Sequence, residues 1–489
     1  MELKSDVEGR VRVSPASLLA FLDGLEQLEL EVNSLILLQN GQTVMEFWRT
    51  PYRQDCPQQL YSLSKSFTSI AVGIAWDRGL LRLDDPVVSF FPDKLPNTVS
   101  PNLTRMTVHH LLSMNAGHRD NIYAQVVKER DWVRAFLAQE VDARPGSFYR
   151  YSTPATYMLS AIVQRVTGQT MADFLVPVLW KPLGIPQPSW ETCPMGVTAG
   201  GMGLSLTTGS IAKFGLMMLG NGMYEGKRIV SEAYIEAATA EQSDNRAGEH
   251  RADSAQGYGY QWFRCREGCY RGGGSFGQLL FVAPEHRIVL AATASFPKMD
   301  RLQTLLDLVY EHLLSPTGGG ETASDSLEAA GELRGRLAGL SCPVPAVRPV
   351  PASLPFTDRA MYRMDANPQG LQTVAFHMKG GRLELRLAYG DERDGSLQLD
   401  FAEPVRGRQV FYKDLLLHEQ EVVTYASWLD DSTLQLVIYY IETPYRVTYA
   451  IHFCEAAIDL RFRINVSLGI PEYDAAGYPG RAGEKHDVE

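Results

Sequence analysis

Strand patterns stand on both sides of a long stretch with helical periodicity, and this order limits the folds open to the chain. Residues 35–38 are apolar, Asn40-Gly41 follows as a two-residue turn, and residues 44–48 continue as a second strand. Between about residues 60 and 238, apolar residues recur at the spacing of amphipathic helices, and Gly- and Pro-containing loops separate the segments. A sheet therefore begins early in the chain and is interrupted by helices.

Strand patterns return after the helical stretch. Residues 258–264, 278–282 and 288–293 have β-type sequences, and a helix is predicted from about residue 302 to 314. Because strands from both ends of this region must meet around a helical middle, we predict an α+β fold in which the late strands complete the sheet begun by the early hairpin.

The composition changes after residue 315. Gly318-Gly319-Gly320, a short amphipathic helix and a Pro-rich stretch lead to residue 355, and this change predicts a domain boundary. Beyond it, apolar residues alternate with polar ones in runs at 374–378, 383–387, 397–401, 434–440, 445–453 and 458–466. This period of two predicts an antiparallel meander or barrel. We divide the 489 residues into a first domain (1–315), a linker with a short helix (316–355), a β-rich domain (356–470) and a flexible tail (471–489).

The charge of the chain excludes some classes of partner. A formal net charge of −11 gives no electrostatic footprint for a nucleic acid or an anionic membrane surface. Residues 1–12 lack the basic and apolar blocks of a signal peptide, and no apolar run reaches about 18 residues. We therefore expect a soluble, cytoplasmic protein that binds neither nucleic acid nor membrane, and the sequence leaves its oligomeric state open.

The six cysteines are too sparse for a disulfide framework. Only Cys265 and Cys269 lie close together, and two reduced thiols beside a hairpin turn are the favoured interpretation. A metal clip is the alternative, but it lacks a second Cys/His pair at ligand spacing. We expect no metal and no cofactor.

Three serines have a lysine three residues later, which is the spacing of a serine nucleophile with a neighbouring amine base: Ser62 with Lys65, Ser210 with Lys213, and Ser295 with Lys298. Pro297 interrupts the third copy. The second copy opens a helix, where a capping role is favoured over catalysis. Ser62 begins a helix whose apolar stripe leaves Ser62 and Lys65 on another face, so catalysis and capping are equally open there.

A different nucleophile is suggested by the Gly-x-Ser-x-Gly sequence at residues 273–277, with Asp300 and His312 downstream in the order of α/β-hydrolases. A nucleophile elbow requires a strand, a sharp turn and a helix, whereas residues 278–282 have the pattern of a strand. We therefore disfavour an elbow at Ser275. A Gly-rich strand edge nevertheless lets backbone N–H groups approach a substrate oxyanion.

The segment from Tyr61 to Ser69 resembles the serine β-lactamase-related family, which includes class C β-lactamases, DD-peptidases, esterases and nylon-oligomer hydrolases. Further matching segments lie at residues 80–92, 106–118, 145–148 and 200–204, so the resemblance spans roughly residues 15–315. It implies a serine hydrolase domain with an antiparallel sheet, flanking helices and a large all-helical insertion.

The resemblance also implies roles for individual residues. Ser62 would be the acylated nucleophile and Lys65 its neighbouring base, while Tyr151 would exchange protons with them. The residue two positions after Tyr151 is an asparagine in the family and is Thr153 here, which would face the substrate. The backbone N–H groups of Ser62 and Ser275 would form the oxyanion hole.

The third motif of the family, Lys-Thr-Gly or His-x-Gly, corresponds to Gly272-Gly273-Gly274 in this sequence. The cationic side chain that helps to hold the carboxylate of a β-lactam is therefore missing, and Arg271 is a possible substitute only if it points to the same face. Gly274, Tyr260 and Trp262 are further candidates for substrate binding. An aromatic ladder in the core is the alternative for the two aromatic residues.

These features predict a metal-free serine hydrolase that forms an acyl-enzyme with a small ester or amide substrate. Penicillin hydrolysis or DD-peptidase activity is the alternative within the same class, and the missing lysine disfavours it. A catalytically inactive binding module is the alternative from another class.

Overall fold

The computed structural model describes residues 13–315, 323–379, 382–455 and 457–480. The N-terminal stretch 1–12, the Gly318–Gly320 run and residues 481–489 lie outside this description. The chain divides into two compact units, each described by itself below: unit 1 comprises residues up to Trp48 together with Gln59–Leu340, and unit 2 comprises Arg49–Gln58 together with the chain from Ser341 onward.

Unit 1 contains a six-stranded antiparallel sheet with the order β2-β1-β10-β9-β8-β7. Its strands are β1 (Val32–Gln39), β2 (Gln42–Trp48), β7 (Phe263–Arg264), β8 (Tyr270–Gly274), β9 (Gln278–Ala283) and β10 (Ile288–Ala294). The central pairing of β1 with β10 joins Leu37 to Leu290, across more than 250 residues of sequence. The predicted α+β fold, in which late strands complete an early hairpin, is confirmed.

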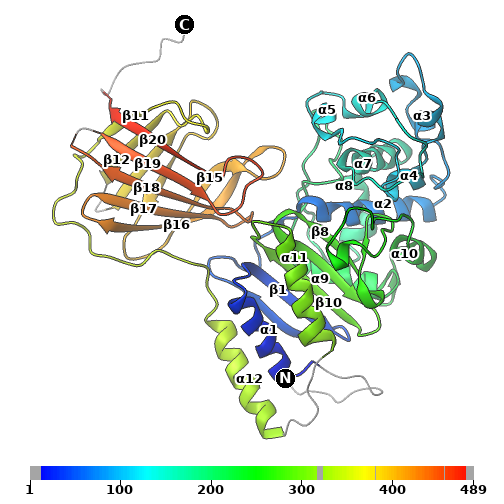
Figure 1. The fold of residues 1–489 in the computed structure, drawn as a ribbon, viewed down its shortest axis with the longest axis horizontal. Coiled ribbons are helices and arrows are strands. Elements are labelled where there is room, and N and C mark those ends of the chain that lie inside the picture. The colour runs from blue at the N-terminus through cyan, green and yellow to red at the C-terminus, as the bar shows by residue number, and fades with distance from the viewer. Residues whose placement is uncertain (1–12, 316–322, 380–381, 456, 481–489) are drawn as a thin grey trace. The chain divides into compact units, whose positions relative to one another are not determined.

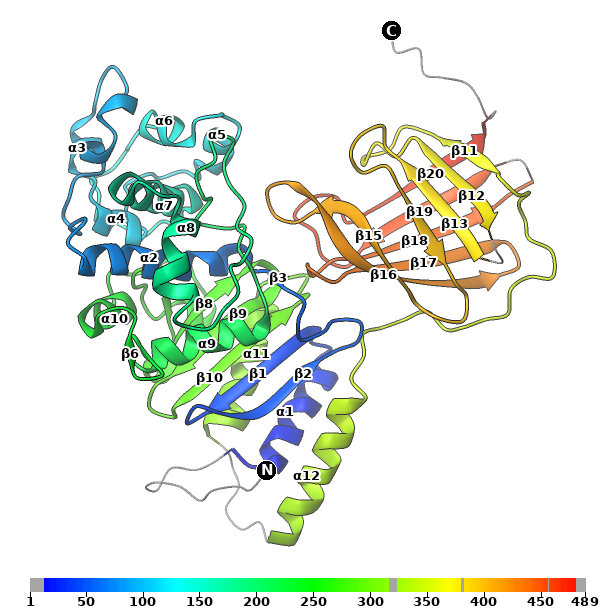
Figure 2. The same cartoon turned by 180° about the vertical axis from the view of Figure 1, so that it is seen from behind.

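Helices cover both faces of this sheet. Helix α1 (Pro15–Gln27) and helix α11 (Asp300–Val309) lie on the face seen in Figure 1, and α9 (Thr208–Leu219) lies on the face seen in Figure 2. All eight residues of β1 are buried because both of its faces are covered. This burial explains why Leu35-Ile36-Leu37-Leu38 is a continuous apolar run rather than an alternating one.

The insertion between β2 and β7 is mainly helical, as predicted. Its α-helices are α2 (Ser64–Asp77), α3 (Pro101–Arg105), α4 (Val108–Leu112), α5 (Tyr123–Val127), α6 (Trp132–Leu137), α7 (Thr153–Thr167), α8 (Met171–Leu175), α9 and α10 (Glu232–Thr239). Short strands accompany them: β3 (Gln58–Gln59), β4 (Ser205–Leu206), β5 (Met223–Tyr224) and β6 (Lys227–Arg228). Among the described residues, no helix has the length and hydropathy needed to cross a bilayer.

Helix α12 (Ala323–Ala338) belongs to unit 1 rather than to a linker. Arg336 forms ion pairs with Asp23 and Glu26 of α1, and Leu333 is buried in the core between the helices and the sheet. The predicted linker 316–355 is therefore wrong for helix α12, because the apolar face of this helix packs on the first unit.

Unit 2 contains a ten-stranded antiparallel sheet with the order β14-β13-β12-β11-β20-β19-β18-β17-β16-β15. The strands are β11 (Met361–Met364), β12 (Thr373–Lys379), β13 (Arg382–Ala388), β14 (Gly395–Leu399), β15 (Val405–Tyr412), β16 (Leu417–Asp430), β17 (Thr433–Tyr440), β18 (Arg446–Phe453), β19 (Ile458–Ile464) and β20 (Glu472–Pro479). Strands β14 and β15, at the two ends of this order, also contact each other, so the sheet is a nearly closed barrel. The predicted β-barrel is thus confirmed.

Strand β20 (Glu472–Pro479) lies within the predicted flexible tail 471–489, so that prediction is wrong for residues 472–479, and residues 481–489 lie outside the described residues. It pairs with β19 through partners such as Phe462 with Tyr473, and with β11 through Arg363 with Tyr478. Small and polar residues such as Ala475, Ala476 and Gly477 weaken the strand pattern in the sequence, and pairing on both sides compensates for their low strand preference.

Residues Arg49–Gln58 leave unit 1 and pack on unit 2, immediately before the segment that carries Ser62. Tyr52 and Cys56 are buried in a small cluster with Val423, Tyr439 and Ile441. Arg53 forms a bidentate ion pair with Glu421, with 2.7 Å between Nη2 and Oε2. The second unit therefore includes residues from the N-terminal part of the chain.

Candidate active site

Ser62 lies in a single 3-10 turn, Tyr61–Leu63, which leads directly into α2. Tyr61 has φ of +49°, a left-handed conformation that costs free energy for a residue with a side chain. Two contacts hold this conformation: the Tyr61 ring packs edge-on against Phe276 at 5.2 Å, and Ser64 Oγ donates a hydrogen bond of 2.6 Å to the Tyr61 carbonyl. The strained turn leaves the Ser62 side chain half-buried at the end of the helix.

Lys65 lies one helical turn beyond Ser62, as the spacing predicts. Its Nζ is 3.0 Å from Ser62 Oγ and donates a second hydrogen bond of 2.7 Å to the Gly201 carbonyl. The side chain is only 2% exposed, and among the described residues it forms no ion pair with a carboxylate. Lys65 is therefore a buried amine aimed at the Ser62 hydroxyl.

The segment Gly200–Leu204 runs along α2 and supplies the carbonyl that holds Lys65. Thr68 Oγ1 donates to the Gly200 carbonyl at 2.8 Å, and the Leu204 N–H donates to Ser64 Oγ at 3.2 Å. A β-carbon on Gly201 would stand 2.8 Å from Thr153 Cγ2, closer than real contacts allow. Glycine at this position therefore permits the close approach that places its carbonyl on Lys65.

Tyr151 presents the face of its ring to Lys65, with Nζ 4.9 Å from the ring centroid. The ring also stacks on Phe263, at 6.1 Å and 19°, and packs edge-on against Tyr258, at 6.4 Å and 82°. Within the described part of the chain, the Tyr151 hydroxyl makes no hydrogen bond, so its contact with Lys65 is a cation–π contact. The structure thus brings Ser62, Lys65 and Tyr151 together, and Tyr151 contacts Lys65 through its ring rather than its hydroxyl.

The backbone around Tyr151 is fixed by the segment that contains Met114. The Arg150 N–H donates to the Met114 carbonyl at 2.8 Å. Ser152 caps α7 by accepting from the Ala155 N–H, and half-buried Thr153 is the first residue of that helix, beside Gly201. The helix cap and the Met114 contact together hold Tyr151 at the mouth of the site.

Two of the three glycines of β8, Gly272 and Gly274, lie against the Ser62 turn, whereas Gly273 faces Arg271 and Leu302. A β-carbon on Gly274 would stand 2.1 Å from the Leu60 carbonyl, and one on Gly272 would stand 2.5 Å from both Leu63 Cδ1 and Ser66 Oγ. Only glycine allows β8 this close to the turn. The half-buried Ser275, which follows Gly274, is thereby brought to the region of Ser62, as the contact between Tyr61 and Phe276 also shows.

Arg271 points to the opposite face of β8 from Gly272 and Gly274. Its guanidinium lies 4.3 Å from the centroid of the Phe263 ring and donates to Ser254 Oγ at 2.7 Å and to the Asp253 carbonyl at 3.2 Å. The side chain is buried. Arg271 therefore does not replace the missing lysine of the third motif.

Two residues expected to bind substrate are placed in the protein core. Trp262 is fully buried and packs on Phe214 and Tyr270, while the Tyr260 hydroxyl lies 2.9 Å from His109 Nδ1. The predicted strand 258–264 is formed only at β7, because Gln261 adopts φ of +66° and interrupts the alternation. Both positions agree with the alternative interpretation of aromatic packing in the core.

Gln261 is a residue that sequence reasoning missed. It accepts from Thr156 Oγ1 at 2.6 Å, donates to the Leu112 carbonyl at 2.7 Å, and accepts at its own carbonyl from Ser66 Oγ at 3.0 Å. It therefore joins α2, α4 and α7 behind the site. No sequence motif marks it, because its importance depends on which helices meet there.

The other candidate nucleophiles have different surroundings. Lys213 donates to the Gly184 carbonyl at 2.9 Å, and Ser210 Oγ lies 2.9 Å from Thr207 Oγ1 within the cap of α9. Ser295 Oγ accepts from Asn33 at 2.8 Å.

The elbow interpretation of Ser275 also lacks structural support. Asp300 lies 3.4 Å from His250, while His312 has Glu311 as its ion-pair neighbour at 3.9 Å. Since unit 1 has an antiparallel sheet and a strand follows Ser275, the elbow geometry is not formed.

Burial shifts the pKa values of several groups near the site. It raises the pKa of Tyr149 and of Tyr258 well above the usual tyrosine value, and the nearby Arg271 opposes this rise. Burial also raises the pKa of the Cys269 thiol to about 12. Cys265 and Cys269 are both free thiols, and no cluster of three or more candidate metal ligands occurs among the described residues.

With this geometry in place, comparison with known proteins gives the family. A family model described as Beta-lactamase matches residues 29–313. The chain belongs to the beta-lactamase family. Beta-lactamase-fold relatives include esterases and amidases, and the segment matched covers the strained turn, Lys65, Tyr151 and the glycines of β8.

Two curated relatives from this family have named activities. The 6-aminohexanoate-dimer hydrolase of Paenarthrobacter ureafaciens is 25% identical over 289 residues, which cover 55% of this chain and 74% of the relative. Esterase EstB of Burkholderia gladioli is 29% identical over 152 residues, 28% of this chain and 38% of that protein.

Solved structures support the fold of both units. A putative beta-lactamase from Bacteroides dorei covers 60% of this chain and 97% of its own with 17% identity and a TM-score of 0.51. The octameric penicillin-binding protein homologue from Pyrococcus abyssi covers 94% of this chain and 99% of its own, with 17% identity and a TM-score of 0.50. At these identities the similarity concerns the fold alone.

Proposed function

We propose that the protein is a serine hydrolase that cleaves a small ester or amide through an acyl-enzyme on Ser62. The observation that carries this proposal is the buried Lys65 amine, 3.0 Å from the Ser62 hydroxyl and without a carboxylate partner among the described residues. A serine hydroxyl becomes an effective nucleophile when an adjacent base accepts its proton.

The proposed reaction has two steps. Ser62 Oγ attacks the substrate carbonyl while its proton passes to Lys65 Nζ, and the backbone N–H groups of Ser62 and Ser275 receive the developing oxyanion. The carbonyl re-forms, the bond to the alcohol or amine breaks, and the leaving group takes the proton. Water then attacks the acyl-enzyme, transfers its proton through Tyr151 and Lys65, and releases the carboxylic acid as Ser62 regains its proton.

The glycine at position 272 favours simple esters and amides over β-lactams. No side chain at this position offers a cation to a substrate carboxylate, and Arg271 is directed to the other face of β8. The names of the relatives, an esterase and an aminohexanoate-dimer hydrolase, are consistent with this choice. The cytoplasmic location expected from the sequence stays a prediction.

Intact-protein mass spectrometry tests the nucleophile. We expect a fluorophosphonate probe to add one label to the wild-type protein and to Ser210→Ala, which removes the matched serine of the second Ser-x-x-Lys copy, but none to Ser62→Ala. A labelled Ser62→Ala protein would overturn the proposal because the reactive nucleophile would lie elsewhere. An unlabelled wild type would overturn it and favour an inactive binding module.

Turnover assays with the same proteins identify the bond. Nitrophenyl-ester or linear-amide hydrolysis that disappears in Ser62→Ala supports the proposed reaction. A penicilloyl adduct that accumulates without ester or amide turnover would instead indicate a penicillin-binding protein, and rapid penicillin hydrolysis would indicate a β-lactamase.

A further inference from the structure

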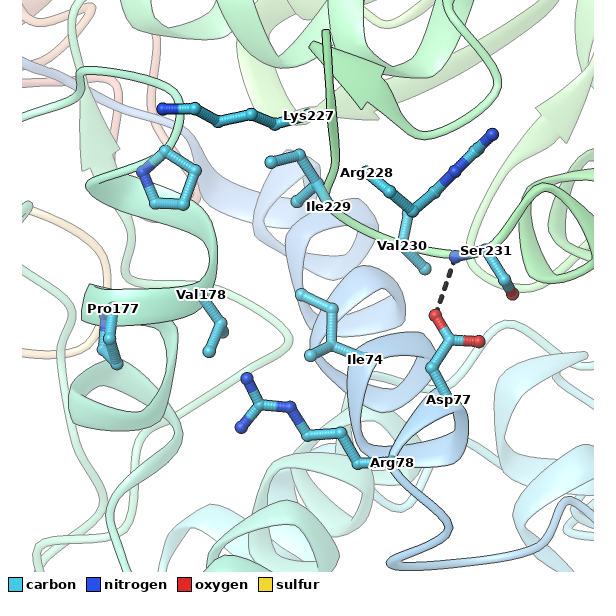
Figure 3. A pocket seen from close by; sticks show the side chains of 11 residues that line it. Ile74, Asp77, Arg78, Pro177, Val178, Lys227, Arg228, Ile229, Val230 and Ser231 are labelled. Atoms are coloured by element: carbon cyan, nitrogen blue, oxygen red, sulfur yellow. Dashed lines mark hydrogen bonds between the residues drawn. The ribbon is translucent and has the colours of Figure 1, made fainter.

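A pocket lies at the end of α2 remote from Ser62. It has a volume of about 570 Å³, within the range of roughly 300–1,000 Å³ that is typical of small-molecule sites. Three parts of unit 1 form its walls: the last turn of α2, the π-helical turn Val176–Trp180, and the segment from β6 to Ser231. Figure 3 shows this pocket from close by.

The floor of the pocket is aliphatic. Ile74 and Val230 are buried, Val178 and Ile229 are half-buried, and Pro177 and Pro182 complete the lining. Figure 3 shows Ile74, Val178 and Ile229 around the open space. Such a floor removes apolar ligand surface from water, which contributes about 25 cal/mol per Å².

Two cationic side chains border this floor. The Arg78 guanidinium is drawn near Val178, and the Lys227 side chain extends above Ile229, whereas Arg228 turns away from the open space (Figure 3). Arg228 is already occupied, because it donates to the Asn221 carbonyl. Arg78 and Lys227 are therefore the cations that face the pocket.

Neither cation is neutralised by a protein carboxylate. Among the described residues Arg78 and Lys227 form no ion pair, and the Arg78 guanidinium carbon lies 5.4 Å from the centroid of the Phe174 ring. The one acidic residue of the lining, Asp77, accepts a hydrogen bond of 2.7 Å from the Ser231 N–H at the start of α10. In a chain with a net charge of −11, this is a local excess of positive charge over an apolar floor.

We propose that this pocket binds a small amphipathic carboxylate. The carboxylate would pair with Arg78, whose planar guanidinium matches two carboxylate oxygens, and Lys227 would add a second positive charge. The aliphatic part of the ligand would lie on Ile74, Val178 and Ile229. A bare anion lacks the apolar contact, and an uncharged alcohol lacks the charge pairing.

The pocket is separate from the site at Ser62. Lys65 and Ile74 are nine residues apart on one α-helix, which corresponds to roughly 14 Å along its axis. Ligand binding there requires neither the Ser62 hydroxyl nor an acyl-enzyme, so the two proposals can fail independently.

Calorimetric titration of the full-length Ser62→Ala protein with octanoate tests the inference. We expect a single site with a negative heat-capacity change, and at least about tenfold weaker binding in Arg78→Gln and in Lys227→Gln. Arg105→Gln, which removes an exposed arginine of α3, is the matched control and is expected to bind as the parent protein does. Lys227 is exposed, so its replacement tests the charge without altering the core.

The comparison ligands separate the two parts of the proposal. Octanol and inorganic phosphate are each expected to bind at least about tenfold more weakly than octanoate. Equal binding of octanol would overturn the role of the cations, and equal binding of phosphate would overturn the role of the floor. Octanoate affinity that is unchanged in both pocket variants, or that is lost when wild-type Ser62 carries the fluorophosphonate label, would place the ligand elsewhere.

Discussion

Gly272 lies so close to Ser66 that a β-carbon built on the glycine would stand 2.5 Å from Ser66 Oγ. Ser66 follows the candidate base Lys65 and donates to the carbonyl of Gln261, so it is held in place from behind. Position 272, where the resemblance implies a lysine or histidine, is therefore packed directly against the Ser62 turn and helix α2. A side chain at position 272 would require Leu63 or Ser66 to shift, so the glycine affects packing as well as ligand chemistry.

Gly272→Lys is expected to lower stability and ester turnover without creating penicillin hydrolysis. Its stem would displace Leu63 or Ser66, and overpacking of this kind typically costs about 1–3 kcal/mol. Urea unfolding and nitrophenyl-ester kinetics measure both effects. Gly335→Ala, in α12 with open space around it, is the control and should be slightly stabilising. A stable Gly272→Lys protein that hydrolyses penicillin would contradict this account of the close approach.

Lys65→Met is expected to lower kcat/KM for an ester by roughly 100- to 10,000-fold, because the methionine cannot accept the Ser62 proton. The matched control is Lys213→Met, since Lys213 has the same spacing from a serine but donates to the Gly184 carbonyl. Steady-state kinetics of both variants give the comparison. Equal losses in the two variants would show that the effect is structural rather than chemical.

Gly201→Ala is expected to reduce kcat/KM by about 10- to 100-fold. The added methyl group would meet Thr153 Cγ2 at 2.8 Å and the Thr153 carbonyl at 3.0 Å, so the Gly201 carbonyl must move away from Lys65. Gly209→Ala in α9, where the nearest atoms are 3.9 Å away, should keep full activity. Retention of activity by Gly201→Ala would argue against a positioning role for this carbonyl.

His118 is expected to lower the stability of unit 1 against unfolding in mild acid. Both of its ring nitrogens are buried without a partner among the described residues, and burial lowers its pKa to about 4, against a smaller opposing effect of Asp142. Between pH 6.5 and 4 the unfolded chain binds a proton that the folded chain does not, so stability falls as pH decreases through this window.

The loss attributable to His118 is up to about 3 kcal/mol. Urea unfolding of His118→Leu at several pH values should show a shallower decline between pH 6.5 and 4 than the wild type. The slope above pH 7 should be the same for both proteins. Parallel curves over the whole range would mean that other groups control the acid response.

Much of the fold follows from periodicity alone. Residues 35–48 form the predicted hairpin through Asn40-Gly41, and the alternating runs after residue 374 form strands of the barrel. These segments are predictable because a strand buried on one face has alternating apolar residues, and a strand buried on both faces has a continuous apolar run. Strand β15 (Val405–Tyr412) and strand β20 lack such an apolar pattern, since much of their stability comes from pairing with neighbouring strands.

The residues of the candidate site are harder to predict from the sequence than the fold is. Three copies of Ser-x-x-Lys are equivalent by spacing, and the resemblance of residues 61–69 to a known family selects Ser62 and Lys65. The tertiary contacts that set Lys65 apart from Lys213, with Gly201 and Tyr151, are seen only in the structure. The alternation of Tyr260 and Trp262 predicts a strand with both side chains on one face. A positive φ at Gln261 interrupts the backbone there, so these two residues do not lie in a strand. Contacts between distant segments and single-residue backbone conformations are not recorded in local sequence patterns.

The short segment Arg49–Gln58 belongs to the second unit, although in the sequence it lies between two stretches of the first unit. The backbone crosses between the units at three peptide bonds, after Trp48, Gln58 and Leu340. A proteolytic nick after Leu340 would leave the barrel tethered through residues 49–58, and a gene shortened at codon 315 would encode Tyr52 and Cys56 without the strands that bury them. A single cut in the chain therefore cannot separate all residues of one unit from all residues of the other.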